Sequence, residues 1–142
     1  MQKYSLNYQK IFIGLVLMMV VSTASFAQTR AVVNVDGTNI SLEFSSNLHS
    51  RVISRIEGNS QPMGNFSPSE CIVIDGKKYQ DFSLSDRAVK EWRDEIGTGM
   101  QFKITGVSGE LQKDITITKY DDFPSMLFLQ VTYTNDGSNI LL

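Results

Sequence analysis

Cysteine, histidine and tryptophan occur once each in the 142 residues, and proline occurs three times. The single cysteine, Cys71, excludes an intramolecular disulfide even in an oxidising compartment. One histidine and one cysteine are too few for a zinc site of the usual ligand types. The run Gly97-Thr98-Gly99 lacks the third glycine and the strand–turn–helix context of a dinucleotide site. We therefore expect no metal and no cofactor.

Positive charge is also in short supply. The chain has 13 Lys and Arg residues against 15 Asp and Glu residues. Without Lys3 and Lys10, which precede the fold, 11 basic residues face 15 acidic ones, a net charge of −4. The basic residues are scattered rather than clustered. Nucleic acids and anionic membranes are bound through basic patches, so neither is an expected partner.

Long apolar runs are absent except for Ile11–Val21, which has 11 residues. A membrane-spanning helix needs about 20. Lys3 and Lys10 precede this run, and Ser25-Phe26-Ala27 follows it with small residues at the positions that a signal peptidase reads. We expect residues 1–27 to be a helical signal peptide. The mature chain, Gln28–Leu142, would then be one exported domain, periplasmic or extracellular.

The strongest pattern present is the alternation of apolar and polar residues in Ile115–Asn135. Asp121–Pro124 is the expected corner between two strands, because Pro124 cannot donate a ladder hydrogen bond and biases Phe123 toward extended geometry. In the second strand, four side chains share one face: Leu127, Leu129, Val131 and Tyr133. Such a hairpin needs a second sheet to cover its apolar face.

Three shorter segments alternate in the same way: Ala31–Asp36, Ile40–Phe44 and Met100–Thr105. Cys71–Ile74, an apolar run, and Lys78–Leu84, with Tyr79, Phe82 and Leu84, are also expected to be strands. Asp36-Gly37, Asp75-Gly76 and the glycines of Gly106–Gly109 are the expected turns between strands. About eight such strands predict an all-β fold, an antiparallel β-sandwich. The apolar ending Ile140-Leu141-Leu142 indicates that this sandwich is incomplete or continues elsewhere.

Three segments are less regular. Leu48–Glu57 fits a strand or a helix, and its neighbourhood favours a strand. Gly58–Glu70 contains turn formers and two prolines, and we expect a long loop, a type of connection that is often functional. Ser85–Glu95 has helical character, with Ser85 as a cap and Trp92 on the apolar face, but a twisted strand and loop fits nearly as well.

Few residues offer chemistry. Asp121 and Asp122 are adjacent in the expected corner, so they point apart and cannot flank a sugar bond as a catalytic pair. His49 has no activated nucleophile motif nearby, and we expect a structural role for it. Cys71 is expected to be a buried thiol in an apolar strand. Trp92 fits equally well as a core side chain or as a stacking surface for a sugar.

Several short motifs occur together in order. They are Asn47-Leu48-His49-Ser50-Arg51, Gly64-Asn65-Phe66-Ser67-Pro68-Ser69-Glu70, Asp75-Gly76 with Asp81-Phe82, Gly97-Thr98-Gly99, Thr105-Gly106, and Tyr120-Asp121-Asp122-Phe123-Pro124 with Tyr133-Thr134-Asn135-Asp136-Gly137. In order and spacing the mature chain resembles the N-terminal region of α-galactosidases of glycoside hydrolase family 36, especially exported bacterial ones.

The resemblance implies a large, supersandwich-like β-domain that precedes a (β/α)8 barrel. In that family the barrel carries both catalytic aspartates, and nothing in this sequence matches the barrel. The whole protein would cleave terminal α-galactosides with retention, and this chain alone would be inactive. In some members a residue of the sandwich reaches the active-site rim or a neighbouring subunit. The candidates here are Trp92 and the loop Gly64–Glu70.

Two other functions remain open. A free-standing carbohydrate-binding module would use Trp92, Tyr79 or Tyr120 as a stacking surface. A structural sandwich would pair its apolar C-terminal edge with another chain.

Overall fold

The computed structural model describes residues 30–135 and 137. The expected signal peptide, 1–27, and the apolar ending Ile140–Leu142 lie outside these residues. All regular elements in the described part are β-strands, which confirms the prediction of an all-β fold. Among residues 30–135 and 137 there is no helix long and apolar enough to cross a membrane.

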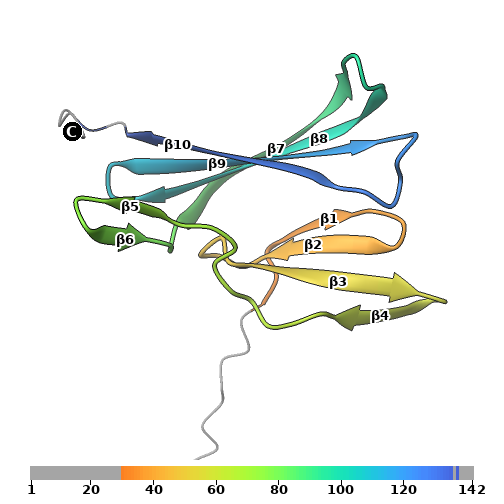
Figure 1. The fold of residues 1–142 in the computed structure, drawn as a ribbon, viewed down its shortest axis with the longest axis horizontal. Coiled ribbons are helices and arrows are strands. Elements are labelled where there is room, and N and C mark those ends of the chain that lie inside the picture. Colours follow the sequence, from red (N-terminus) through yellow and green to blue (C-terminus); the bar gives the residue numbers. More distant parts are fainter. Residues whose placement is uncertain (1–29, 136, 138–142) are drawn as a thin grey trace, which may run out of the picture.

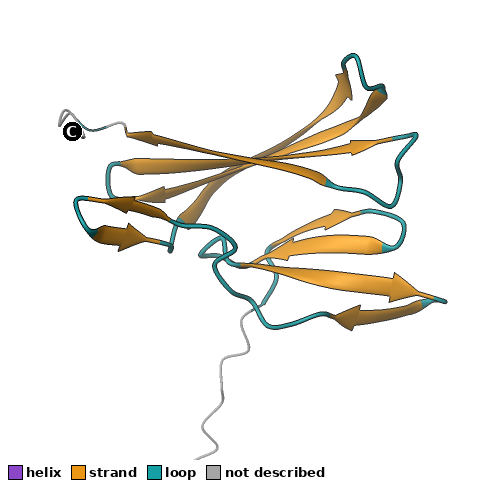
Figure 2. Ribbon diagram, viewed as in Figure 1, coloured by secondary structure: helices purple, strands orange, loops and turns teal. Residues whose placement is uncertain are grey.

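The strands form three antiparallel sheets (Figures 1 and 2). The N-terminal sheet has the order β1-β2-β3-β4, the C-terminal sheet has the order β10-β9-β8-β7, and β5 and β6 form a small separate hairpin. The strands are β1 (Val33–Asp36), β2 (Ile40–Phe44), β3 (Ser50–Ile56), β4 (Asn59–Pro62), β5 (Ile72–Ile74), β6 (Lys77–Tyr79), β7 (Ser83–Arg93), β8 (Thr98–Ser108), β9 (Leu111–Tyr120) and β10 (Phe128–Asn135). In Figure 1 the N-terminal and C-terminal sheets lie as two layers, with the hairpin beside them.

The core lies between these layers. Val35 and Phe44 from the N-terminal sheet are buried against Ile104, Ile115 and Ile117 from the C-terminal sheet. Leu48, Phe82 and Leu111 complete the buried cluster. Because neighbouring residues of a strand point to opposite faces, every second residue of β9 enters this core. The antiparallel sandwich expected from the alternation is therefore confirmed.

The hairpin of β9 and β10 closely follows its sequence pattern. Phe128 pairs with Thr118 and Asn135 with Leu111, so β9 begins earlier than the pattern indicated. Leu127, Val131 and Tyr133 pack against the core as expected. Leu129 is 46% exposed, although it shares their face. The hairpin thus obtains only part of its cover from the N-terminal sheet.

The structure decides the open segment Ser85–Glu95 in favour of a strand. It forms most of β7, which pairs with β8 from Ser83 to Arg93 with one register shift between Leu84 and Asp86. This pairing satisfies the backbone of β7 through β8, and tertiary context overrides a weak helical preference. Leu48–Glu57 is also largely a strand, β3, as expected.

Part of the expected loop Gly58–Glu70 is regular instead. Asn59–Pro62 forms the edge strand β4 beside β3. Pro62 is tolerated there because an edge strand can leave a backbone position without a ladder hydrogen bond. Only the segment after Pro62 runs as an irregular connection to β5.

The predicted turn at Gly106–Gly109 is wrong for Gly106, which lies inside β8. A Cβ added at Gly106 would lie 3.1 Å from Cβ of Phe82 and would overlap the side chain of Leu48. Gly106 therefore permits close packing rather than a turn. The chain turns at Gly109 instead, which has a φ of +63°.

The expectation of a buried Cys71 is also wrong, because the side chain is exposed. Cys71 directly precedes β5, in which Ile72 and Ile74 pack against the core while Val73 is 61% exposed. Period-two alternation places Cys71 on the same side as Val73, which faces solvent.

Candidate functional site

The residues that could contact a ligand gather at one end of the outer face of the C-terminal sheet, the face turned away from the core. Register places Trp92 of β7, Gly99 of β8 and Tyr120 of β9 in one cross-strand row. Ile115 and Ile117 of β9 point into the core, so Tyr120 points outward. Trp92 lies on the same face as Tyr120 and is not among the residues of the buried core cluster or those packed against it.

Asp94 fixes the two aromatic residues of this row. The indole Nε1 of Trp92 donates a hydrogen bond of 2.9 Å to Oδ2 of Asp94, and the hydroxyl of Tyr120 donates one of 2.6 Å to the same oxygen. Oδ1 of Asp94 accepts the backbone N–H groups of Ile96 and Gly97. Such a carboxylate-to-backbone turn tightens the connection between β7 and β8.

These contacts change the acidity of both partners. The hydrogen bonds from Tyr120 and Trp92 lower the pKa of Asp94 below its ordinary value. The same hydrogen bond to Asp94 raises the pKa of Tyr120 above its ordinary value. Asp94 therefore remains an anion, and Tyr120 remains a neutral donor, through the neutral pH range.

A hollow of about 410 Å³ opens beside Trp92. Its lining mixes charged, polar and apolar groups from β7, from β8 and from the corner after β9: Glu91, Trp92, Arg93, Thr98, Gly99, Met100 and Asp121. Trp92 remains partly exposed there. The ammonium of Lys90 lies 4.8 Å from the centroid of the indole, which is a cation–π distance. The hollow thus combines one fixed aromatic ring with several groups that form hydrogen bonds.

Asp121 and Asp122 occupy the corner after β9, as expected. The hydroxyl of Thr98 donates a hydrogen bond of 2.9 Å to Oδ2 of Asp121, and the backbone N–H of Asp121 donates to the carbonyl of Thr98. Oδ1 of Asp121 has no hydrogen-bond donor among the described residues. Asp121 therefore holds the corner and still presents one carboxylate oxygen at the hollow.

The other stacking candidates are less available. Tyr120 is only 5% exposed, so its ring cannot receive a sugar face. Tyr79 packs against the core, and the ammonium of Lys77 lies 4.7 Å from its ring. Trp92 is the one of the three whose ring adjoins a hollow.

The loop Gly64–Glu70 lies elsewhere, beside β3. Part of it lines a smaller hollow of about 230 Å³ together with Ser50, Arg51, Val52 and Met63. The guanidinium of Arg51 lies 4.4 Å from the ring centroid of Phe66 and 2.7 Å from a carboxylate oxygen of Glu43. The guanidinium of Arg51 therefore already has a cation–π partner and an ion-pair partner.

His49 has a structural partner. Its Nε2 lies 2.7 Å from a carboxylate oxygen of Asp81, and its backbone N–H donates to the hydroxyl of Ser45. These contacts connect the loop before β3 to the segment before β7. They favour the structural role expected for His49.

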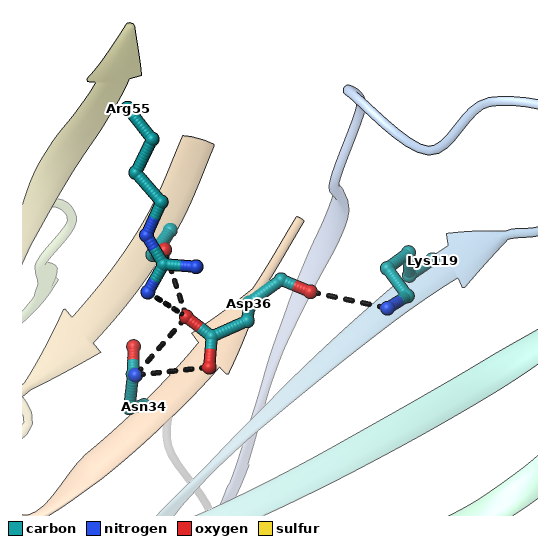
Figure 3. Close-up of polar contacts among 5 residues, drawn as sticks. Asn34, Asp36, Arg55 and Lys119 are labelled. Carbon is teal, nitrogen blue, oxygen red and sulfur yellow. Dashed lines mark hydrogen bonds and ion pairs between the residues drawn. The ribbon is translucent and has the colours of Figure 1, made fainter. Parts of the chain in front are cut away.

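A polar cluster around Asp36 joins the two layers (Figure 3). Its carboxylate accepts hydrogen bonds from Asn34, from Ser41 at 2.9 Å and from Arg55. Its backbone carbonyl accepts a hydrogen bond of 3.2 Å from Nζ of Lys119 on β9. Because Asp36 belongs to β1 and Lys119 to β9, the cluster connects the two sheets.

The sequence patterns do not identify Asp94 as a site residue, although its carboxylate holds both Trp92 and Tyr120. Its only local signal is the spacing Asp94…Gly97, which is typical of a carboxylate-stabilised turn.

Nowhere in the described part of the chain do three His, Cys, Asp or Glu side chains gather closely enough to hold a metal ion. No protein-family model matches the sequence, and no curated protein matches it.

Proposed function

We propose that this chain is the non-catalytic, leading β-sandwich of an exported α-galactosidase-like hydrolase, and that it contacts carbohydrate through the hollow at Trp92. One observation carries the proposal. Trp92 is held outside the core, by its hydrogen bond to Asp94, next to a hollow of about 410 Å³. Indole rings stack on the apolar faces of sugars, and a ring that is already fixed loses little entropy on binding.

The polar lining suits a sugar as well. A pyranose presents hydroxyl groups around its edge while its face stacks. Asp121 offers a carboxylate oxygen, and Glu91 and Arg93 add a second acceptor and a donor at the same hollow. A concave site with one aromatic ring and a few polar groups is the usual form of a small-ligand site.

The catalytic step is assigned to another domain. A retaining glycosidase needs two carboxyl groups about 5–5.5 Å apart on either side of the scissile bond. Asp121 and Asp122 are consecutive residues of a corner, and Asp121 is bound to Thr98. In family 36, which the sequence resembles, a (β/α)8 barrel carries both aspartates, and here the sandwich would support such a barrel and shape its entrance.

The exported chain itself tests both parts. With a chromogenic α-galactoside we expect no turnover, and turnover would contradict the non-catalytic assignment. Trp92 is the only tryptophan, so its fluorescence reports on the hollow directly. Galacto-oligosaccharides should change this emission with an affinity between millimolar and micromolar. Emission and chemical shifts that do not respond to galactosides would contradict sugar contact.

Two variants sharpen the result. Trp92→Ala lacks the indole emission, so its binding is followed by chemical shifts; it should weaken binding about tenfold, the loss expected for one stacking contact. Arg51→Ala changes the smaller hollow and should leave binding unchanged. A free-standing carbohydrate-binding module would use the same hollow, and the nucleotide sequence after codon 142 separates the two: an in-frame barrel supports the hydrolase.

A further inference from the structure

The side chain of Lys113 is fully buried, which is unfavourable for a charged ammonium group. Its side chain is 0% exposed, and its Nζ lies 2.5 Å from Oε1 of Glu70, whose side chain is 24% exposed. Neither atom has the angles of a hydrogen bond in this contact, and neither has another hydrogen-bond partner among the described residues. Ordinary charge-assisted N–H···O contacts are about 2.7–2.9 Å long. The amine and the carboxyl group are therefore in direct contact without being well paired.

The surroundings of this contact are aromatic. Phe82, which is fully buried, has its ring centroid 5.5 Å from Nζ of Lys113 and 5.6 Å from the ring centroid of Tyr133. Tyr133 of β10 pairs with Lys113 of β9 in register. Its hydroxyl is buried and has no hydrogen-bond partner in the described part. These rings keep water away from Nζ.

Tyr133 keeps its proton in this place. Burial, together with the negative charges of Glu70 and Cys71, raises the pKa of Tyr133 to about 12. Tyr133 pairs with Lys113 in register, and the charge of Glu70 acts on its phenol. A neutral phenol in this place is the candidate proton donor for the carboxyl oxygen and could return that proton.

We propose that Lys113 and Glu70 form an amide cross-link without an external enzyme. The ammonium first gives one proton to the carboxylate, which leaves a neutral amine and a neutral acid. The amine lone pair of Nζ attacks Cδ of Glu70, and Tyr133 donates to the oxygen on which charge develops. The intermediate loses the acid hydroxyl together with a proton from Nζ as one water molecule, and Tyr133 recovers its proton.

Two physical effects favour this reaction. Charges taken out of water are unfavourable unless they are well paired, and the amide removes both of them. The fold also holds the reacting groups in contact, which converts a bimolecular condensation into an intramolecular step. The product ties β9, in the middle of the C-terminal sheet, to the connection before β5. In a chain with a single cysteine it provides the covalent closure that a disulfide cannot.

Tryptic digestion of the exported chain, after unfolding in denaturant, tests the proposal. The expected product joins the peptide Ile56–Lys77 to the peptide Ile104–Lys119, with a mass lower than their sum by one water. Cleavage after Lys113 should be lost. Cleavage after Lys103 should remain, because its side chain is 53% exposed and its ammonium lies 3.2 Å from Asp114 in an ordinary ion pair. Recovery of the separate peptides Ile56–Lys77 and Ile104–Lys113 as the main species would overturn the cross-link.

Two variants assign the roles. Lys113→Arg keeps a positive charge but cannot form the amide, so its peptides should be linear and its unfolding midpoint lower. Tyr133→Phe keeps the ring against Phe82 and removes only the hydroxyl, so the fraction cross-linked at a given time should fall. An unchanged fraction in Tyr133→Phe would overturn the role of its hydroxyl as proton donor.

Discussion

The hydroxyl of Tyr120 donates a hydrogen bond of 2.6 Å to the carboxylate of Asp94, which lies 26 residues earlier in the chain. This contact joins the end of β9 to the turn between β7 and β8. The same carboxylate oxygen accepts the indole N–H of Trp92. The position of the partly exposed Trp92 ring therefore depends on two residues that do not themselves line the hollow.

The first prediction concerns the pH dependence of this contact. The pKa of Asp94 is lowered in the folded protein, so its stabilising contribution is present above its ordinary pKa of 3.8 and is lost as the pH falls below that value. Tyr120→Phe removes the largest cause of the shift. We expect the unfolding temperature of the wild type to fall more steeply below pH 4 than that of Tyr120→Phe, measured by circular dichroism.

The alkaline part of the same profile of unfolding temperature against pH provides the control for this experiment. The pKa of Tyr120 is raised, so its contribution is present below pH 10 and is lost as the pH rises through the folded value. Asp94→Asn should flatten both parts of the profile, because it removes the carboxylate that titrates in acid and the hydrogen-bond acceptor that raises the pKa of Tyr120. Identical acid limbs in the wild type and in Tyr120→Phe would contradict a link between these residues.

The second prediction concerns Gly99, which lies between Trp92 and Tyr120 in the cross-strand row. A Cβ added there would lie 2.8 Å from Cα of Tyr120 and would overlap the carbonyl oxygen of Lys119. Backbone atoms cannot move away as a flexible side chain can. Gly99→Ala should cost about 1–3 kcal/mol of unfolding free energy and change the Trp92 emission.

Gly64→Ala is the matched control, because nothing lies within 4 Å of a Cβ at that position. Its effect on the unfolding free energy should stay within about 0.5 kcal/mol. Urea denaturation of both variants, followed by circular dichroism, gives the comparison. Equal stability of the two variants would mean that the strands are not packed this closely at Gly99.

The sequence predicted most of the architecture because period-two alternation follows directly from strand geometry. Ile115 and Ile117 alternate with threonines, and these isoleucines are the residues that become buried. The Asp75-Gly76 turn was equally readable, since both residues take a positive φ of the kind that Asp-Gly favours. The turn predicted at Gly106 is wrong because, in the sequence, a glycine that permits close packing looks the same as a glycine in a turn.

The site was predictable only in part. Trp92 stood out as a lone aromatic residue among charges, but its orientation depended on whether Ser85–Glu95 was a strand. Asp94 and Tyr120 meet through strand pairing, which no local pattern records. The burial of Lys113 is similarly a product of tertiary packing, because lysine at an alternating position of a strand is ordinarily placed toward solvent.

The third prediction tests the core. Ile115 is 0% exposed and lies in the central cluster, so Ile115→Ala removes buried methyl groups and leaves a cavity. We expect a loss of about 2–5 kcal/mol in unfolding free energy. Ile56→Ala makes the same substitution at a residue that is 65% exposed, and it should change stability by no more than about 0.5 kcal/mol. Comparable losses in both variants would contradict the placement of Ile115.

The last prediction concerns the contact between the layers at Asp36. Burial raises the pKa of Asp36, but the hydrogen bond from Ser41 and the charge of Arg55 outweigh it, so the net pKa is lowered. Its stabilisation is therefore present above the ordinary value of 3.8 and is lost as the pH falls below it. Asp36→Ala should cost about 1 kcal/mol at neutral pH, because the pair with Arg55 is partly exposed.

Lys119→Met separates the two halves of this cluster. Nζ of Lys119 contacts the backbone carbonyl of Asp36 rather than its carboxylate. Lys119→Met should therefore lower the unfolding free energy without changing how that free energy falls in acid. Asp36→Ala should change both. Unfolding free energies measured in urea at pH 7 and pH 3 test this difference. If Asp36→Ala lost as much stability at pH 3 as at pH 7, the carboxylate would not be the stabilising group.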